Sequence, residues 1–434
     1  MDRNRLLSHG TLAAAAAAVA LLAGAARAAG EGDGDEAVHL GVASCASSTC
    51  HGRVTPDEDS PLALNEYFVW SKYDHHAGAY KTLKGDWSRR IAANMGLADA
   101  ATAEECLACH ADDVPEERRG ERFHLSDGIG CEACHGGAGD WIDSHYGPDA
   151  SHAANLEAGM NPTEEPVFQA RLCQSCHVGD DNRFVTHEMM AAGHPRLRFE
   201  LDTWLANMPP HHVEDADYER RKGTTAPADR WATGVAVAAG GYLDILARHL
   251  DADALVPELS LFDCHACHRP MDTDVRRLAE DRRMMPAGTL RPQDQTLRML
   301  GVVTAVRDEA LSDTIERGNR ALHGAAAGSP ADFRTRLRAL REPVARARET
   351  VTSAPLSADE RAALQNALLR TAADARFRDY ADAEQLYLAL QALAAQDNDA
   401  RAARYDTLFR LLESERRFDP RRVAAEARRL LQER

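Results

Sequence analysis

Hydrophobic residues recur every three or four positions through the last third of the chain, which is the spacing of amphipathic helices. Residues 290–434 are also rich in Ala, Leu, Arg and Glu. Ser329-Pro330 has the form of a helix N-cap followed by proline at the first helical position. Ser357–Glu360 has the form of a capping box. We expect a helical bundle here, with further helices over residues 380–396, 399–416 and 420–433.

The segment before this bundle carries shorter helical patterns. In the run Asn65–Tyr80, three residues share one helix face, Trp70, Tyr73 and Ala77. A linker marked by proline and glycine, Met285–Gly288, separates this segment from the bundle. The pattern predicts a mainly α protein with little β structure, divided into residues 1–28, 29–283 and 284–434.

The first 28 residues have the form of a secretory signal peptide. Arg3 and Arg5 precede a short apolar core, and Ala26–Ala28 supplies small residues for cleavage. The core is too short to span a bilayer, although an uncleaved membrane anchor is the alternative. No other apolar run approaches spanning length, so we expect a soluble periplasmic protein after cleavage.

The chain is acidic, and its charge limits the partners that it can bind. The formal net charge is −17, and loss of three arginines and one aspartate with the signal makes it −19. This charge disfavours nucleic acid and anionic membranes, and it favours a redox partner with a basic docking patch. Ordinary solubility is the plainer explanation of the same charge.

All ten cysteines fall in five short runs that end in histidine. Four runs read Cys-x-x-Cys-His, in which two thiols add to the vinyl groups of one porphyrin and the histidine binds its iron. The first run has four residues between its cysteines and needs a bulged loop to meet the same vinyl groups. The runs predict five covalently attached haem c groups, at Cys45, Cys50 and His51; Cys106, Cys109 and His110; Cys131, Cys134 and His135; Cys173, Cys176 and His177; and Cys264, Cys267 and His268.

Zinc sites and disulfides are the alternatives, because zinc also uses Cys-x-x-Cys pairs and exported chains often contain disulfides. Neither requires histidine directly after the second cysteine, yet histidine fills that position five times although the chain has only 19. For Cys45 and Cys50 a disulfide remains the alternative. Aromatic residues are few, 24 of 434, so porphyrins should supply much of the apolar core of the first domain.

Each iron has a second axial position, and the remaining histidines are enough to fill it. His187 and His194 are seven residues apart, about 10.5 Å along a helix, so they can serve two irons but not one. Pro195 places His194 at a helix end. His75 or His76 and His145 are the other candidates. The reserves are His124, His152, His211, His212, His249 and His265, whereas Met189 and Met190 are more typical of packing.

Residues 42–177 resemble the tetrahaem electron-carrier cytochrome c of ammonia oxidisers and the wider multihaem family around hydroxylamine oxidoreductase. The resemblance rests on Trp70 with His75-His76-Ala77, on the motifs from Cys106 to His177, and on Gly130–Gly136 followed by His145. It implies that His76 and His145 are distal ligands and that one iron is five-coordinate. In this chain the five-coordinate iron would belong to the motif that ends at His110, for which His124 is the nearest candidate partner.

This sequence departs from that family in its widened first motif, its added fifth motif and Gly137-Ala138, which follow the third. The Gly137-Ala138 pair affects the path that the chain takes to His145. Closely spaced haems between pairs of histidines predict a periplasmic electron carrier. The alternative is an oxidoreductase acting on nitrite, nitric oxide, hydroxylamine or a small sulfur species at one open haem. The bundle should serve docking, homo-oligomerisation or stabilisation of the haem domain.

Overall fold

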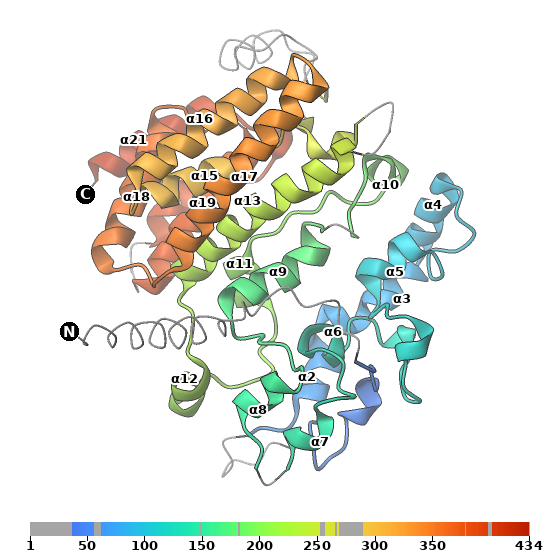
Figure 1. Ribbon diagram of the computed structural model, residues 1–434. Helices are drawn as coiled ribbons and strands as arrows, with labels where there is room; N and C mark the ends of the chain where they lie inside the picture. Colours follow the sequence, from blue (N-terminus) through green and yellow to red (C-terminus); the bar gives the residue numbers. More distant parts are fainter. Residues whose placement is uncertain are drawn as a thin grey trace, which may run out of the picture.

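The computed structural model describes residues 37–55, 62–147, 149–180, 183–251, 257–264, 267–268, 290–377, 379–397 and 402–433. It is 65% helical with almost no strand, which confirms the prediction of a mainly α fold (Figure 1). In the described residues two isolated bridges join His39 to Arg119 and Phe262 to Pro292. The predicted signal peptide, the linker Met285–Gly288 and His265 lie outside the described residues.

The first half of the chain is built from short helices. They are α2 (Glu66–Tyr73), α3 (Ala79–Leu83), α4 (Asp86–Met95), α5 (Glu104–His110), α6 (Cys131–His135), α7 (Ile142–His145), α8 (His152–Glu157), α9 (Pro166–His177), α10 (His187–Ala192), α11 (Leu201–Asn207) and α12 (Ala216–Lys222). Short 3-10 turns lie between and after them, at η1 (Val42–Ser44), η2 (His75–Gly78), η3 (Glu116–Arg118), η4 (Leu125–Asp127) and η5 (Leu259–Leu261).

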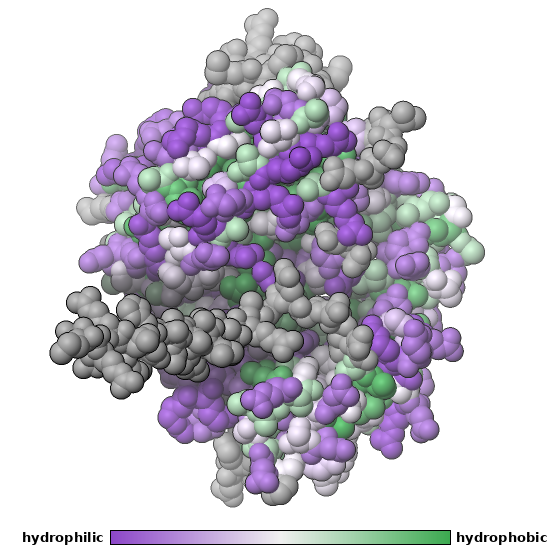
Figure 2. Space-filling model, viewed as in Figure 1, coloured by the Kyte–Doolittle hydropathy of each residue, from purple (hydrophilic) through white to green (hydrophobic). Residues whose placement is uncertain are grey.

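The second half contains the longer helices. They are α13 (Pro227–Asp251), α15 (Gln295–Ala305), α16 (Glu309–Ala326), α17 (Pro330–Thr352), α18 (Ala358–Ala373), α19 (Tyr380–Gln396), α20 (Asp406–Leu412) and α21 (Pro420–Gln432), with turns η7 (Ala402–Tyr405) and η8 (Glu415–Arg417). Their outer faces are mostly hydrophilic in Figure 2, as amphipathic helices require. No helix in the described part of the chain is long and apolar enough to cross a membrane.

Local signals located several of these helices correctly. The Ser329 side chain accepts a hydrogen bond from the Asp332 N–H at the start of α17, and Pro330 is the first helical residue. Ser357 and Glu360 form both bonds of a capping box at α18. The helix expected over residues 399–416 is instead divided into η7, α20 and η8. This division accompanies the burial of Tyr405, whose hydroxyl accepts a hydrogen bond from Gln365.

The large hydrophobic core belongs to the second half of the chain. It contains buried residues from α13 and from every helix between α15 and α21. The long helix α13 also packs against α9 and α11, and it therefore joins the bundle to the first half (Figure 1). Gly234 allows this approach, because a Cβ there would lie 2.8 Å from the Leu201 Cβ. The division into domains at residue 283 stays a prediction.

The first half has much less protein core. Its described hydrophobic clusters are small: one joins α3, α4 and α5 through Leu83, Ala92 and Leu107, and another contains Ala170, Leu201 and Val237. Short helices with so few buried side chains cannot bury much apolar surface on their own. This arrangement fits a segment in which porphyrins complete the core.

Candidate haem-binding site

Each cysteine motif forms a compact turn that ends at its histidine. The second, third and fourth motifs lie on α5, α6 and α9, and each of these helices ends at the motif histidine. In the fifth motif the His268 N–H donates to the Cys264 carbonyl at 2.7 Å, which is one helical turn. Two cysteines three residues apart on such a turn point to the same side. Both thiols can therefore reach one porphyrin.

The widened first motif reaches a similar arrangement through a bulge. The His51 N–H donates to the Cys45 carbonyl at 3.1 Å, across four intervening residues, and the Cys50 N–H donates to the Ser47 carbonyl. Gly52 packs so closely that a Cβ would lie 1.9 Å from the Ala46 carbonyl oxygen. All ten cysteines are free, so Cys45 and Cys50 are not joined by a disulfide.

Four of the five motif histidines face a second histidine across a gap. The ring centroids are 6.0 Å apart for His51 and His145, and 6.0 Å apart for His177 and His76. They are 6.3 Å apart for His135 and His211, and 6.3 Å apart for His268 and His187.

This spacing is the one that an iron atom between two imidazoles requires. Histidine nitrogens lie about 2.0 Å from a bound metal, so two imidazoles on opposite sides of one iron have centroids about 6 Å apart. Zinc fits less well, because the described residues contain no group of three or more His, Cys, Asp or Glu side chains that could hold a metal ion. The donor set therefore suits haem iron.

The second motif is arranged differently. His110 lies near His194, which follows the end of α10. His124 lies beside Asp127 and in the small hollow that also includes Cys131 and Glu132. The structure thus brings His194, rather than His124, toward His110.

The geometry also places two other candidate histidines. His76 points toward His177, whereas its neighbour His75 is exposed. His211 faces His135, although sequence reasoning kept it only among the reserves. Pro209-Pro210 could have pointed to it, because this pair excludes a helix and predicts an extended segment able to carry His211 across to another element.

Hydrogen bonds to Nδ1 orient several of these imidazoles and leave Nε2 for iron. The Nδ1 atom of His51 bonds to Glu66 at 3.0 Å, and that of His76 bonds to Asp74 at 2.9 Å. Asp74 also ends α2 and accepts a hydrogen bond from the backbone N–H of His76. The helix expected over Asn65–Tyr80 is therefore interrupted just before the candidate ligand His76. The His110 Nδ1 atom bonds to the Ala79 carbonyl at 3.1 Å.

Electrostatics divides the histidines into two groups. Burial, together with the nearby His211, lowers the pKa of His135 to about 3. Burial and His76 lower the pKa of His177 to about 4. In contrast, the hydrogen bonds that the His51 and His76 rings donate to carboxylates raise the pKa of both histidines. The neutral imidazole is the form that binds a metal, and a carboxylate on Nδ1 makes it a stronger donor.

Thiols of different motifs also meet. Cys45 lies within hydrogen-bonding reach of Cys131, and Cys109 lies within reach of Cys176. The first motif therefore adjoins the third, and the second adjoins the fourth. Gly128, with φ +72°, lets the loop before the third motif approach the His76 carbonyl, since a Cβ would lie 2.7 Å from that oxygen. Haems held at these motifs would be close neighbours.

Glu132, inside the third motif, holds this region together. Only 3% of its surface is exposed, and its carboxylate accepts backbone N–H bonds from Leu40, Gly41 and Ala138 at 2.6–2.7 Å. These bonds join the loop before the first motif to the turn that leads to His145. Ala138, one of the departures from the family pattern, is completely buried in this turn.

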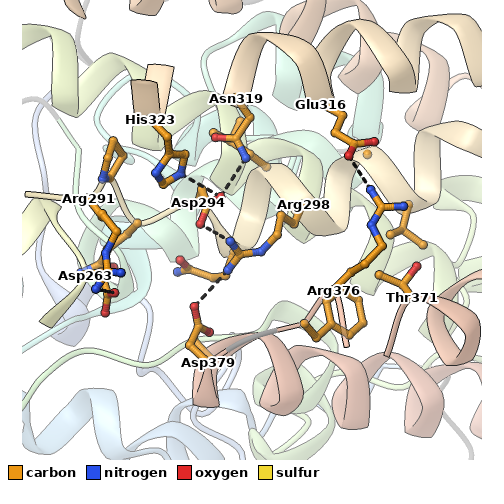
Figure 3. Close-up of a pocket in the computed structure, with 18 of the residues that line it drawn as sticks. Asp263, Arg291, Asp294, Arg298, Glu316, Asn319, His323, Thr371, Arg376 and Asp379 are labelled. Atoms are coloured by element: carbon orange, nitrogen blue, oxygen red, sulfur yellow. Dashed lines mark hydrogen bonds and ion pairs between the residues drawn. The ribbon is translucent and has the colours of Figure 1, made fainter. Parts of the chain in front are cut away.

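A cavity of about 500 Å³ lies where the fifth motif meets the bundle (Figure 3). Cys264 lines it, and Asp263 forms an ion pair with Arg291 at 3.1 Å. Deeper in the cavity, Asp294 bonds to Arg298 and to His323 of α16. Burial opposes the charge of Asp294, but Arg298 and His323 keep its pKa below the usual value. This network anchors the fifth motif to the bundle.

Residues 44–136 match the family model described as cytochrome c554 and c-prime. The match contains the first three motifs and ends directly after His135. No curated protein and no solved structure matches the chain.

Proposed function

We propose that this chain, a multihaem c-type cytochrome of the c554 type involved in electron transfer, binds five haem c groups and relays electrons between redox partners in the periplasm. Most of its irons would lie between two histidines. The observation that carries this proposal is the set of four histidine pairs with centroids 6.0–6.3 Å apart.

Haem c bound at these sites supplies reversible one-electron chemistry at iron. The protein contributes the environment. The paired histidines would hold the irons and keep water and small substrates away from them. Glu66 and Asp74 hold the orientation of His51 and His76. The contacts between motifs keep the sites adjacent, as electron transfer requires.

The direct test is the electron paramagnetic resonance spectrum of the oxidised holoprotein, with a pyridine haemochrome count. We expect five haems per chain and mainly low-spin iron. His211→Ala should convert one haem to high spin, because it removes the partner of His135. The matched control is His212→Ala, which removes a ring stacked on Tyr218 at 5.0 Å instead. A haem count well below five, or equal spectra for both variants, would contradict the proposal.

The location and partner are also proposed. The signal-like segment 1–28 and the covalent haem chemistry support export, and cell fractionation tests it. The net charge of −17 for the whole chain supports a partner with a basic docking patch. Electron transfer to such a partner should slow as ionic strength rises, because salt screens the attraction. A rate that is independent of salt would exclude electrostatic docking.

An oxidoreductase remains a second candidate because of one motif. The His110 ring lacks the close histidine partner that the other four motifs have in the described residues. An open iron at His110 would bind nitric oxide or cyanide, and a high-spin signal sensitive to these ligands would favour the enzyme.

A further inference from the structure

We propose that His194 completes the coordination of the second haem iron and that His187 completes the coordination of the fifth. Helix α10 is then a rigid bridge that connects the fifth haem to the other four. The inference rests on the proposed binding of five haems. It removes the open position that the second candidate function needs.

The start of α10 is fixed to the fifth motif. Thr186 caps the helix by accepting the Met189 N–H at 3.1 Å. The His187 N–H donates to Glu258 at 2.8 Å, and Glu258 also holds Ser260 in η5, just before Cys264. The His187 ring then lies 6.3 Å from that of His268, with the two planes 34° apart.

The end of α10 is fixed to the second motif. The Ala192 carbonyl accepts from the Asn94 side chain at 2.9 Å, and the Gly193 carbonyl accepts from the Trp87 ring N–H at 3.1 Å. Both partners lie on α4, beside which α10 packs in Figure 1. Helix α4 shares a small hydrophobic cluster with Leu107 of α5, the helix that ends at His110.

The imidazole of His194 is oriented for coordination. The backbone N–H of His194 donates to the Met189 carbonyl at 2.9 Å, which closes the helix end, and Gly193 takes the φ of +121° that this turn needs. The His194 Nδ1 atom donates to the Pro195 carbonyl at 2.8 Å, so Nε2 is left for a metal.

The helix sets the distance between the two sites. His187 is the first residue of α10 and His194 follows Gly193 just past its last residue, so a six-residue helix, about 9 Å long, and one further turn lie between the two imidazoles. A spacing of this kind suits direct electron transfer between neighbouring haems but excludes a shared iron. The fifth haem would therefore exchange electrons through the second haem, and α10 would keep the two haems at a fixed separation.

Spectra of the oxidised holoprotein test the bridge. We expect five low-spin haems in the unaltered chain and one high-spin haem of five, open to cyanide, in His194→Ala. His187→Ala should give a different single high-spin haem. His194→Met should stay low-spin and raise the potential of one haem, because methionine ligation raises it. If the His194→Ala protein fails to retain a haem, the spectrum and potential of His194→Met still test the role of His194.

An insertion tests the rigidity. One alanine added after Met190 rotates His187 by about 100° relative to His194, since a helix has 3.6 residues per turn. We expect exactly one of the two haems to become high-spin. The control is one alanine added after Gly223, in the open turn that follows α12, and it should leave all haems low-spin. The bridge is wrong if five haems are present and His194→Ala or the α10 insertion leaves the spectrum unchanged. A count of fewer than five haems per chain would contradict the proposed function instead.

Discussion

The rings of His51 and His145 lie 6.0 Å apart with their planes within 26° of parallel, although 94 residues separate them in the sequence. His51 ends the bulged first motif, and His145 ends α7. Two imidazoles bound to one metal would show this centroid spacing, since histidine nitrogens lie about 2.0 Å from a bound metal. The centroid spacing recurs at three more motifs, at 6.0–6.3 Å, although two of those pairs have nearly perpendicular planes.

Removal of the carboxylate behind His51 should raise the reduction potential of the first haem. Glu66 accepts the Nδ1 hydrogen bond, which makes the imidazole a stronger donor and stabilises ferric iron. We expect Glu66→Gln to raise one potential by about 60 mV, a tenfold change for a one-electron couple. Asp74→Asn should do the same for the fourth haem. Spectroelectrochemical titration measures both, and exposed Glu117→Gln is the control.

Loss of the Glu132 carboxylate should loosen the first and third motifs together. Glu132→Gln keeps the size of the side chain but leaves buried N–H groups of Leu40, Gly41 and Ala138 short of acceptors. Each unsatisfied group costs about 1–3 kcal/mol. We expect a lower melting temperature and lower haem occupancy, measured by calorimetry and haemochrome assay. Full occupancy with unchanged melting would show that the three bonds are dispensable.

Asp294 should make the stability of the bundle depend on acid. Its pKa is lowered in the folded protein, so its stabilisation is complete above the unfolded value of about 3.9 and is lost as the pH falls further. Asp294→Asn breaks a buried pair, which costs about 3–5 kcal/mol at neutral pH. Denaturant unfolding at pH 7 and pH 3 measures the difference in unfolding free energy between the unaltered chain and the variant. This difference should be smaller at pH 3. Exposed Asp313→Asn should show no such change.

The first motif should bind haem covalently despite its wider spacing. We expect the double variant Cys45→Ser and Cys50→Ser to contain one haem fewer per chain than the unaltered protein, because only thiols form the thioether bonds. Mass spectrometry of the denatured chain counts covalent haems. An equal count in both proteins would mean that Cys45 and Cys50 serve another purpose.

The sequence by itself determined the features that depend on neighbouring residues. A Cys-x-x-Cys-His run is a single turn of chain, so its chemistry can be recognised without the rest of the molecule. The cap at Ser357 and the whole of α19 are local in the same way, because they depend on side chains within one helix. The mainly α character follows from many such local signals.

The tertiary structure decided which histidines meet. His211 reaches His135 and His194 approaches His110 from segments far along the chain, and local signals such as Pro209-Pro210 and Pro195 do not say which motif each histidine meets. The tertiary structure also packs α13 against both halves, because burial across the whole molecule outweighs the preference of any one segment. Pairing across a long sequence separation is a property of packing, and packing is settled only when all parts of the chain are present.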